Sequence, residues 1–198
     1  GLNTGGMGAV SPVPFADKEF MDKVITRIVE PTINGIYSER MNYVGFVYMG
    51  LIKVGNDPFV IEYNARLGDP EAEVVLPRIQ SDFLELLIKA GKGELAGANL
   101  EITPHFATTV MMVSGGYPGD YEKGKPINGL EKTTSKTLFH AGTRANGDHI
   151  ETAGGRVLAA TATGSTLTEA ITGSYQLANL IEFEGKYMRK DIGKDVLN

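Results

Sequence analysis

The chain has 198 residues, a hydrophobic content of 42% and a formal net charge of −5, enough apolar material for one large domain or two small ones. No apolar run reaches the roughly 18 residues of a transmembrane helix, and the amino terminus lacks the basic and apolar segments of a secretory signal. Its 19 Lys and Arg residues form no basic tract. We therefore expect no membrane partner and no nucleic-acid partner.

The sequence contains no cysteine, which excludes disulfides and zinc–thiolate sites. This composition fits a reducing compartment, so we expect a cytoplasmic protein, either a monomer or a weak homo-oligomer. The chain opens on Gly1 with a glycine-rich segment and no initiator methionine. A glycine-rich loop with no strand before it is typical of the middle of a polypeptide. We expect this chain to be an excised part of a longer protein.

The first elements in chain order are a loop, Asn3–Gly8, and an amphipathic helix, Lys18–Glu30. Apolar residues recur at helical spacing through the helix, and Asp17 can cap its start. Pro31 should kink or restart the helix, because proline cannot donate the backbone hydrogen bond that a helix interior needs. The sequence predicts that the helix then continues over residues 32–40.

A β-hairpin and two short helices are predicted next. Tyr43–Val54 is rich in β-branched and aromatic residues, a Gly-Asn-Asp-Pro turn follows, and Phe59–Tyr63 forms the second strand. Pro70–Arg78 should be a short helix with acidic residues in its first turn. Ser81 and Asp82 should cap a second helix, Phe83–Lys89, which is predicted to end at Gly91.

The second half of the chain indicates strands closed by one helix. Strands are predicted at Phe106–Val113, Thr137–Gly142 and Gly155–Ala162, with a hairpin turn at Asn146-Gly147. A capping box at Thr166–Glu169 predicts the start of a helix that runs to about Leu180. We expect an α+β protein with a boundary near residues 92–104. The expected domains are residues 1–93 and a β-rich domain with one packed helix, residues 94–198.

Glu62, Asn64 and Arg66 lie two residues apart in a run that otherwise indicates a strand. Side chains alternate faces along a strand, so these three should point the same way. Carboxylate and amide oxygens suit Mg²⁺, and a guanidinium binds phosphate or carboxylate. The pattern predicts a phosphoryl-transfer site, with a solvated polar strand face as the alternative. The segment that follows, residues 68–71 (Gly-Asp-Pro-Glu), favours the site.

Several longer segments are distinctive. In chain order they are NTGGMGA, VGFVYMGL, VIEYNARLGDPE, SGGYPGDY, FHAGT, GGRVLAATA and MRKDIG. Together they resemble the carboxy-terminal part of the phosphoribosylamine–glycine ligase (glycinamide ribonucleotide synthetase) family, over about Asn3 to Gly193. RLGDPE, at Arg66–Glu71, is the most specific of them.

The resemblance implies an ATP-grasp fold and a role in de novo purine synthesis. Residues 1–93 would be the catalytic wall of a partial ATP-grasp domain. The family joins 5-phosphoribosylamine to glycine through a glycyl phosphate, and ATP is cleaved to ADP and phosphate. Family members are longer, and their amino-terminal domain and most of the ATP-clamping lid would precede Gly1. The resemblance therefore also implies that this chain alone is inactive and binds ATP weakly.

The resemblance also implies roles for individual residues. Glu62 and Asn64 look like the family's ligands for Mg²⁺ or Mn²⁺. Arg66 is the candidate for holding the transferring phosphoryl group or the glycine carboxylate, with a salt bridge to Asp69 or Glu71 as a concurrent alternative. Asp69 could orient Arg66 or accept from the substrate amine. Pro70 and Glu71 are expected to build the turn and the start of a helix.

The glycine-rich loop is the candidate nucleotide contact. Its residues Asn3, Thr4, Gly5, Gly6 and Gly8 allow backbone N–H groups to approach an anion closely, although no Gly-Lys-Ser/Thr follows as in a Walker loop. A flexible turn is the alternative. Residues 115–120 are interpreted as a tight turn rather than a wall near the ribose phosphate. His105, His140 and His149 have no metal-ligand spacing, and Arg189–Asp191 is interpreted as a solvated tail.

Two other functions stay open. One is a different ATP-grasp carboxylate–amine ligase or a carboxylase, against which RLGDPE and GGYPGDY argue. The other is a non-catalytic domain that retains the fold.

Overall fold

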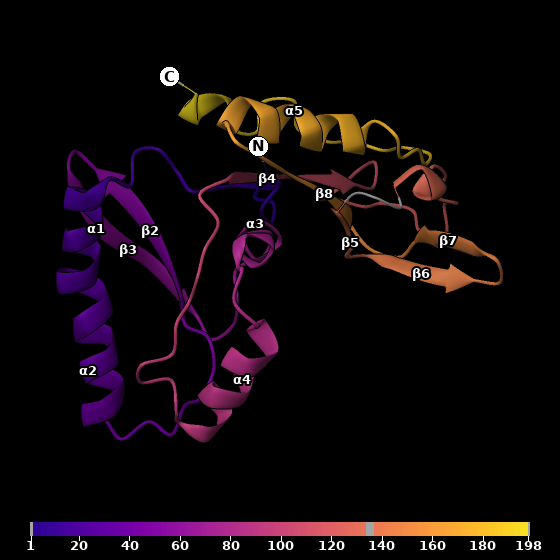
Figure 1. Cartoon of the computed structure of the whole chain (residues 1–198). Coiled ribbons are helices and arrows are strands. Elements are labelled where there is room, and N and C mark those ends of the chain that lie inside the picture. The colour runs from indigo at the N-terminus through magenta and orange to yellow at the C-terminus, as the bar shows by residue number, and fades with distance from the viewer. Residues whose placement is uncertain (1, 134–136, 198) are drawn as a thin grey trace. The chain divides into compact units, whose positions relative to one another are not determined.

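The computed structural model describes residues 2–133 and 137–197 as an α+β fold (Figure 1). Its internal contacts divide the chain into two compact units. Unit 1 contains residues 1–11, 69–78 and 103–198, and unit 2 contains residues 12–68 and 79–102. A single cut near residue 93 does not give this division, because two early segments fold with the carboxy-terminal half.

Unit 1 is built on a four-stranded antiparallel sheet in the order β1-β4-β8-β5. These strands are β1 (Gly8–Ser11), β4 (Phe106–Val113), β8 (Arg156–Gly164) and β5 (Thr137–His140). The two central strands are almost wholly buried, which fits their largely apolar sequence. The strand β1 was not expected from the sequence, which predicted a loop as far as Gly8.

Helix α5 (Leu167–Ala178) and the short helix α3 (Ala72–Val75) lie on opposite faces of this sheet (Figure 1). Both bonds of the predicted capping box form at Thr166 and Glu169. Ser174 donates its hydroxyl to the Thr108 carbonyl oxygen at 2.7 Å, which ties α5 to β4. The α5 side of the core contains Met112, Ile127, Val157, Leu158, Ala160, Leu177, Ala178, Ile181 and Phe183.

A second hairpin in unit 1 consists of β6 (Thr143–Asn146) and β7 (His149–Thr152), so the predicted turn at Asn146-Gly147 is confirmed. The buried carboxylate of Glu151 accepts hydrogen bonds from Arg144 and Asn146 across this hairpin. Short 3-10 turns complete the unit at Leu76–Arg78, Leu130–Thr133 and Lys194–Val196.

In unit 2 the predicted first helix forms as α1 (Lys18–Val24), a π-helical turn (Ile25–Val29) and α2 (Glu30–Ser38). Asp17 caps α1 by accepting from the Phe20 N–H at 2.8 Å. Pro31 lies at the start of α2, directly after the wider π turn, in a helix that runs without a break from residue 18 to residue 38. No described helix is both long and apolar enough to cross a bilayer.

The predicted hairpin of unit 2 consists of β2 (Tyr48–Val54) and β3 (Asp57–Asn64). The expected first strand was too long, because Tyr43–Val47 is not strand and Tyr43 instead donates its hydroxyl to the Phe46 carbonyl at 2.7 Å. The expected turn was too long as well. Pro58 pairs with Lys53 as the second residue of β3.

Helix α4 (Phe83–Lys92) also belongs to unit 2 and is capped by Asp82, as predicted. It ends at Gly93 and not at Gly91. Gly93 has a left-handed backbone with φ of 72°, which is the conformation that closes a helix, whereas Gly91 stays inside the helix.

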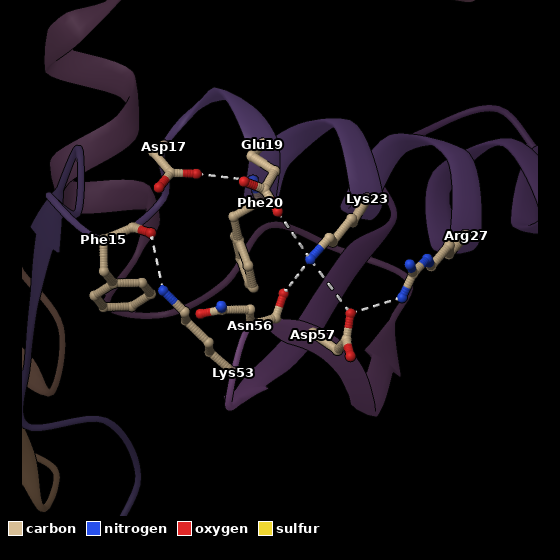
Figure 2. A network of polar contacts seen from close by, with 9 residues as sticks. All are labelled: Phe15, Asp17, Glu19, Phe20, Lys23, Arg27, Lys53, Asn56 and Asp57. Carbon is tan, nitrogen blue, oxygen red and sulfur yellow. Dashed lines mark hydrogen bonds and ion pairs between the residues drawn. The ribbon is translucent and has the colours of Figure 1, made fainter.

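Charged side chains fasten α1 and the π-helical turn to the tip of the β2–β3 hairpin, as Figure 2 shows. Arg27 pairs with Asp57 at 2.8 Å, and Lys23 donates to the Asn56 carbonyl at 2.9 Å. On the same hairpin, the Lys53 ammonium lies 5.6 Å and 5.3 Å from the ring centroids of Phe15 and Phe20. These contacts fix the end of the hairpin opposite the end that carries Glu62 and Asn64.

Candidate active site

Glu62 and Asn64 lie on one face of β3, near its end, as the alternation of the sequence predicts. The Asn64 amide nitrogen donates to Glu62 Oε1 at 3.1 Å, so the two side chains are adjacent. Tyr63, between them, points to the other face, where its hydroxyl lies 2.9 Å from the hydroxyl of Thr32 on α2. Helix α2 therefore contacts the opposite face of the strand at Tyr63, and Glu62 remains exposed.

Gly50 makes room for Glu62. It pairs with Glu62 across the hairpin, and a Cβ added at Gly50 would lie 2.9 Å from the Glu62 Cγ. The register shifts directly after this pair, so that Ile61 has no partner residue on β2. Bulges of this kind re-aim a neighbouring side chain. Sequence reasoning identified the carboxylate but missed the glycine that accommodates it.

Arg66 does not share this strand face. β3 ends at Asn64, and Arg66 lies in the bend that follows, where its guanidinium donates to the Leu67 carbonyl at 2.8 Å. The expectation of three side chains alternating along one strand was wrong for this residue, because the strand stops too early. Arg66 remains exposed.

The chemistry of the donor set at Glu62 and Asn64 fits a hard divalent cation. Within the described ranges no group of three or more His, Asp or Glu residues could hold a metal ion. One carboxylate and one neutral amide oxygen are nevertheless sufficient where substrate phosphates supply further ligands, as is usual for Mg²⁺. The Asn64 amide nitrogen now faces Glu62, so a half-turn of the amide would bring both oxygens to the same point.

The glycine-rich loop lies in unit 1, directly before β1. Gly8 is already the first residue of β1 and pairs with Val110. The Gly5 N–H donates to the Tyr117 hydroxyl at 2.9 Å. The predicted turn at residues 115–120 therefore contacts the glycine-rich loop, which the sequence did not reveal. Asn3, Thr4, Gly5 and Gly6 are exposed.

Asp69 is held by an arginine that sequence reasoning did not single out. Arg156, the first residue of β8, pairs with Asp69 Oδ2 at 2.7 Å and donates to the Asp69 carbonyl at 3.1 Å. Pro70 is buried behind a cis peptide bond, and Glu71 precedes α3 as its cap residue. The expectation that Pro70 and Glu71 build a turn and a helix start is confirmed.

The other residues considered from the sequence have local partners. His140 Nδ1 lies 2.9 Å from the Thr143 hydroxyl at the end of β5. Arg189 and Asp191 form an exposed ion pair with each other. They line, with Leu2, Thr4, Met7, Tyr117 and Tyr187, a surface hollow next to the glycine-rich loop.

Glu73 on α3 is a half-buried carboxyl near Asp69. Its Oε2 atom is buried without a hydrogen-bond partner among the described residues. Burial raises the pKa of the Glu73 carboxyl, and the nearby charge of Asp69 acts in the same direction. The folded chain therefore keeps a proton on Glu73 at pH values where the unfolded chain has released it.

This shift predicts a pH-dependent effect of Glu73→Gln. Below the ordinary pKa of a glutamate, Glu73 holds its proton in both the folded and the unfolded chain, so the substitution should change the melting temperature little. Stability of the unsubstituted chain falls as pH rises from that value toward the raised pKa, because only the unfolded state gives up its proton there. We expect Glu73→Gln to melt a few degrees higher at neutral pH, and this advantage to shrink near about pH 4.

The exposed residue Glu39, at the end of α2, gives the matched control, because Glu39→Gln should shift melting little at either pH. Thermal unfolding followed by circular dichroism at both pH values measures all three proteins. An equal effect of Glu73→Gln at both pH values would contradict the assigned burial cost.

Comparison with known proteins identifies the class of this chain. Residues 1–72 match the model described as "Phosphoribosylglycinamide synthetase, ATP-grasp (A) domain", and residues 107–195 match "Phosphoribosylglycinamide synthetase, C domain". The crystal structure of Kluyveromyces lactis urea carboxylase aligns with 96% of this chain and 17% of its own at a TM-score of 0.65, but at 12% identity this likeness shows the fold alone. The fold and the match of residues 1–72 to the ATP-grasp (A) domain together define an ATP-grasp protein.

Two closer relatives narrow this class. A phosphoribosylamine–glycine ligase of Vibrio cholerae is 45% identical over 98% of the chain and 46% of its own length. The crystal structure of the Thermotoga maritima phosphoribosylamine–glycine ligase aligns with 96% of the chain and 47% of its own at 37% identity and a TM-score of 0.83. This chain belongs to the phosphoribosylglycinamide synthetase family, as its carboxy-terminal part, and spans about half the length of these relatives.

Proposed function

We propose that the chain supplies part of the active site of an ATP-dependent ligase that joins 5-phosphoribosylamine to glycine. The observation that carries this proposal is the adjacent pair Glu62 and Asn64 at the end of β3, inside the segment that matches the ATP-grasp model. Relatives that are 44–45% identical over nearly the whole chain are named for this activity. The products would be glycinamide ribonucleotide, ADP and phosphate.

The reaction would proceed in two transfers. The glycine carboxylate attacks the terminal phosphate of ATP, which releases ADP and forms glycyl phosphate. The amine of phosphoribosylamine then attacks the acyl carbon and displaces phosphate. Catalysis of phosphoryl transfer depends mainly on positioning and charge neutralisation.

The residues of this chain suit those tasks. Glu62 and Asn64 would hold Mg²⁺ or Mn²⁺, which when bound neutralises phosphate charge. Arg66, exposed beyond the strand, would bind the glycine carboxylate or the transferring phosphoryl group. Backbone N–H groups of residues 3–8 would donate to phosphate oxygens. Asp69 would act through its fixed ion pair with Arg156 and not as a freely moving base.

The function is tested in a chimera that joins the amino-terminal part of the Vibrio cholerae relative to this chain. We expect phosphate release that requires ATP, glycine and phosphoribosylamine together, with glycinamide ribonucleotide detected by mass spectrometry. The unmodified relative is the control for assay conditions. Release that requires bicarbonate, or an amine other than phosphoribosylamine, would refute the ligase and favour a carboxylase or another carboxylate–amine ligase.

A further inference from the structure

Four sequence segments of unit 1 meet around the side chain of Arg156. Its guanidinium donates to the Gly6 carbonyl at 3.2 Å, to the Asp69 carbonyl at 3.1 Å and to Asp69 Oδ2 at 2.7 Å. The fourth segment contributes Tyr117, which accepts from the Gly5 N–H. Arg156 is separated from Gly6 by 150 residues and from Asp69 by 87, so folding of the whole unit is needed to make this cluster.

The packing around Arg156 leaves little room for a side chain at Gly5, Gly6 or Gly155. A Cβ added at Gly5 would lie 3.1 Å from the Arg156 Cζ and 3.2 Å from the Tyr117 hydroxyl. A Cβ at Gly6 would lie 2.2 Å from the Pro70 Cδ, and one at Gly155 would lie 2.2 Å from the Tyr117 ring. The glycines thus allow direct contact between the loop and its anchors.

The anchors are themselves fixed. Ser114, at the start of the turn that carries Tyr117, donates its N–H to the Gly155 carbonyl at 2.8 Å and its hydroxyl to the Gly154 carbonyl at 2.9 Å. Arg156 follows these residues directly and begins the buried strand β8. Its side chain is only 22% exposed, so it has few alternative positions.

The contact with the Gly6 carbonyl determines the direction of the next N–H. The Gly6–Met7 peptide is trans, so its C=O and its N–H point in opposite directions. Because Arg156 holds the Gly6 carbonyl, the Met7 N–H points away from Arg156. Among the described residues, neither the Gly6 nor the Met7 N–H has a hydrogen-bond acceptor. A backbone N–H group that lacks an acceptor can donate to a bound anion.

We propose that Arg156 is a positioning residue, which holds the Gly6–Met7 peptide so that the free N–H groups of the loop face a nucleotide phosphate. This inference rests on the proposed ligase function for its catalytic consequence. Asp69 is the partner that keeps Arg156 in place, and Tyr117 fixes the neighbouring peptide. Arg156 touches no reacting atom in this account.

The anchoring is tested on the chain itself. We expect ¹⁵N relaxation to show rigid amides at residues 3–8, with order parameters near about 0.85, and values below about 0.6 in Arg156→Met. Tyr117→Phe should loosen Gly5 alone. The matched control is Arg144→Met, which removes another ion-paired arginine of unit 1 and should leave the loop ordered. A loop that stays rigid in Arg156→Met would overturn the proposal.

The catalytic consequence is tested in the chimera. Arg156→Met should lower kcat by about 100-fold, since misplacement of a positioning group costs this much, with the KM for glycine changed less than about threefold. Arg156→Lys should recover part of the rate, and Arg144→Met should retain it. Disorder of the loop with unchanged kcat would overturn the positioning role. An inactive parent chimera would refute the ligase function, while relaxation on the chain would still decide the anchoring.

Discussion

Replacing Glu62 by alanine in the chimera is expected to lower kcat by at least about 100-fold, because the proposed cation would lose the charged ligand that this chain supplies. The rate loss should be partly recovered by raising the concentration of Mg²⁺. Steady-state kinetics at several metal concentrations measures both effects. Asn64→Ala should have a smaller effect in the same direction, because it removes a neutral ligand.

Folding should be unaffected by Glu62→Ala. The Glu62 side chain is exposed, and its one described hydrogen bond is to Asn64. The melting temperature of Glu62→Ala should therefore match that of the unsubstituted chain. Unfolding comparable to a core deletion would show that Glu62 is a structural residue and would remove the basis of the proposed metal site.

Gly6→Ala is expected to have the largest effect on stability among the glycine substitutions of the loop. The new Cβ would lie 2.2 Å from the Pro70 Cδ and 3.3 Å from the Asp69 carbonyl, and neither group can move as a flexible side chain does. Overpacking of this kind costs about 1–3 kcal/mol. Denaturant unfolding of the chain measures the cost, and the chimera should also lose ligase activity because the loop is displaced.

Gly91→Ala is the matched control. A Cβ at Gly91 would meet nothing within 4 Å, and Gly91 lies inside helix α4. Alanine is favoured over glycine in a helix by about 0.5–1 kcal/mol, so this variant should be slightly more stable. Equal stabilities for Gly6→Ala and Gly91→Ala would contradict the close packing of the loop against Pro70.

Local sequence signals predicted the elements that depend on local structure. The strand Phe106–Val113 has the predicted bounds, and the capping box at Thr166 forms as expected. The turn-flanked hairpin placed Glu62 and Asn64 side by side, because alternation along a strand is a property of a few neighbouring residues. A short stretch of sequence is therefore enough to predict that part of the candidate site.

The parts that sequence reasoning missed depend on contacts between distant segments. β1 has only four residues and forms because Gly8 pairs with Val110, about half the chain away. The partner of Asp69 is Arg156, and no spacing rule connects the two. Arg66 was misplaced for a different reason, since nothing in the alternating pattern shows that the strand stops at Asn64.

The central claim is that Glu62 and Asn64 hold a divalent cation together with a nucleotide. Electron paramagnetic resonance of Mn²⁺, titrated into the chimera with ADP present, tests it most directly. We predict nucleotide-dependent binding of Mn²⁺ that is lost in Glu62→Gln and kept in Glu39→Gln. Equal Mn²⁺ binding by all three proteins would contradict the account.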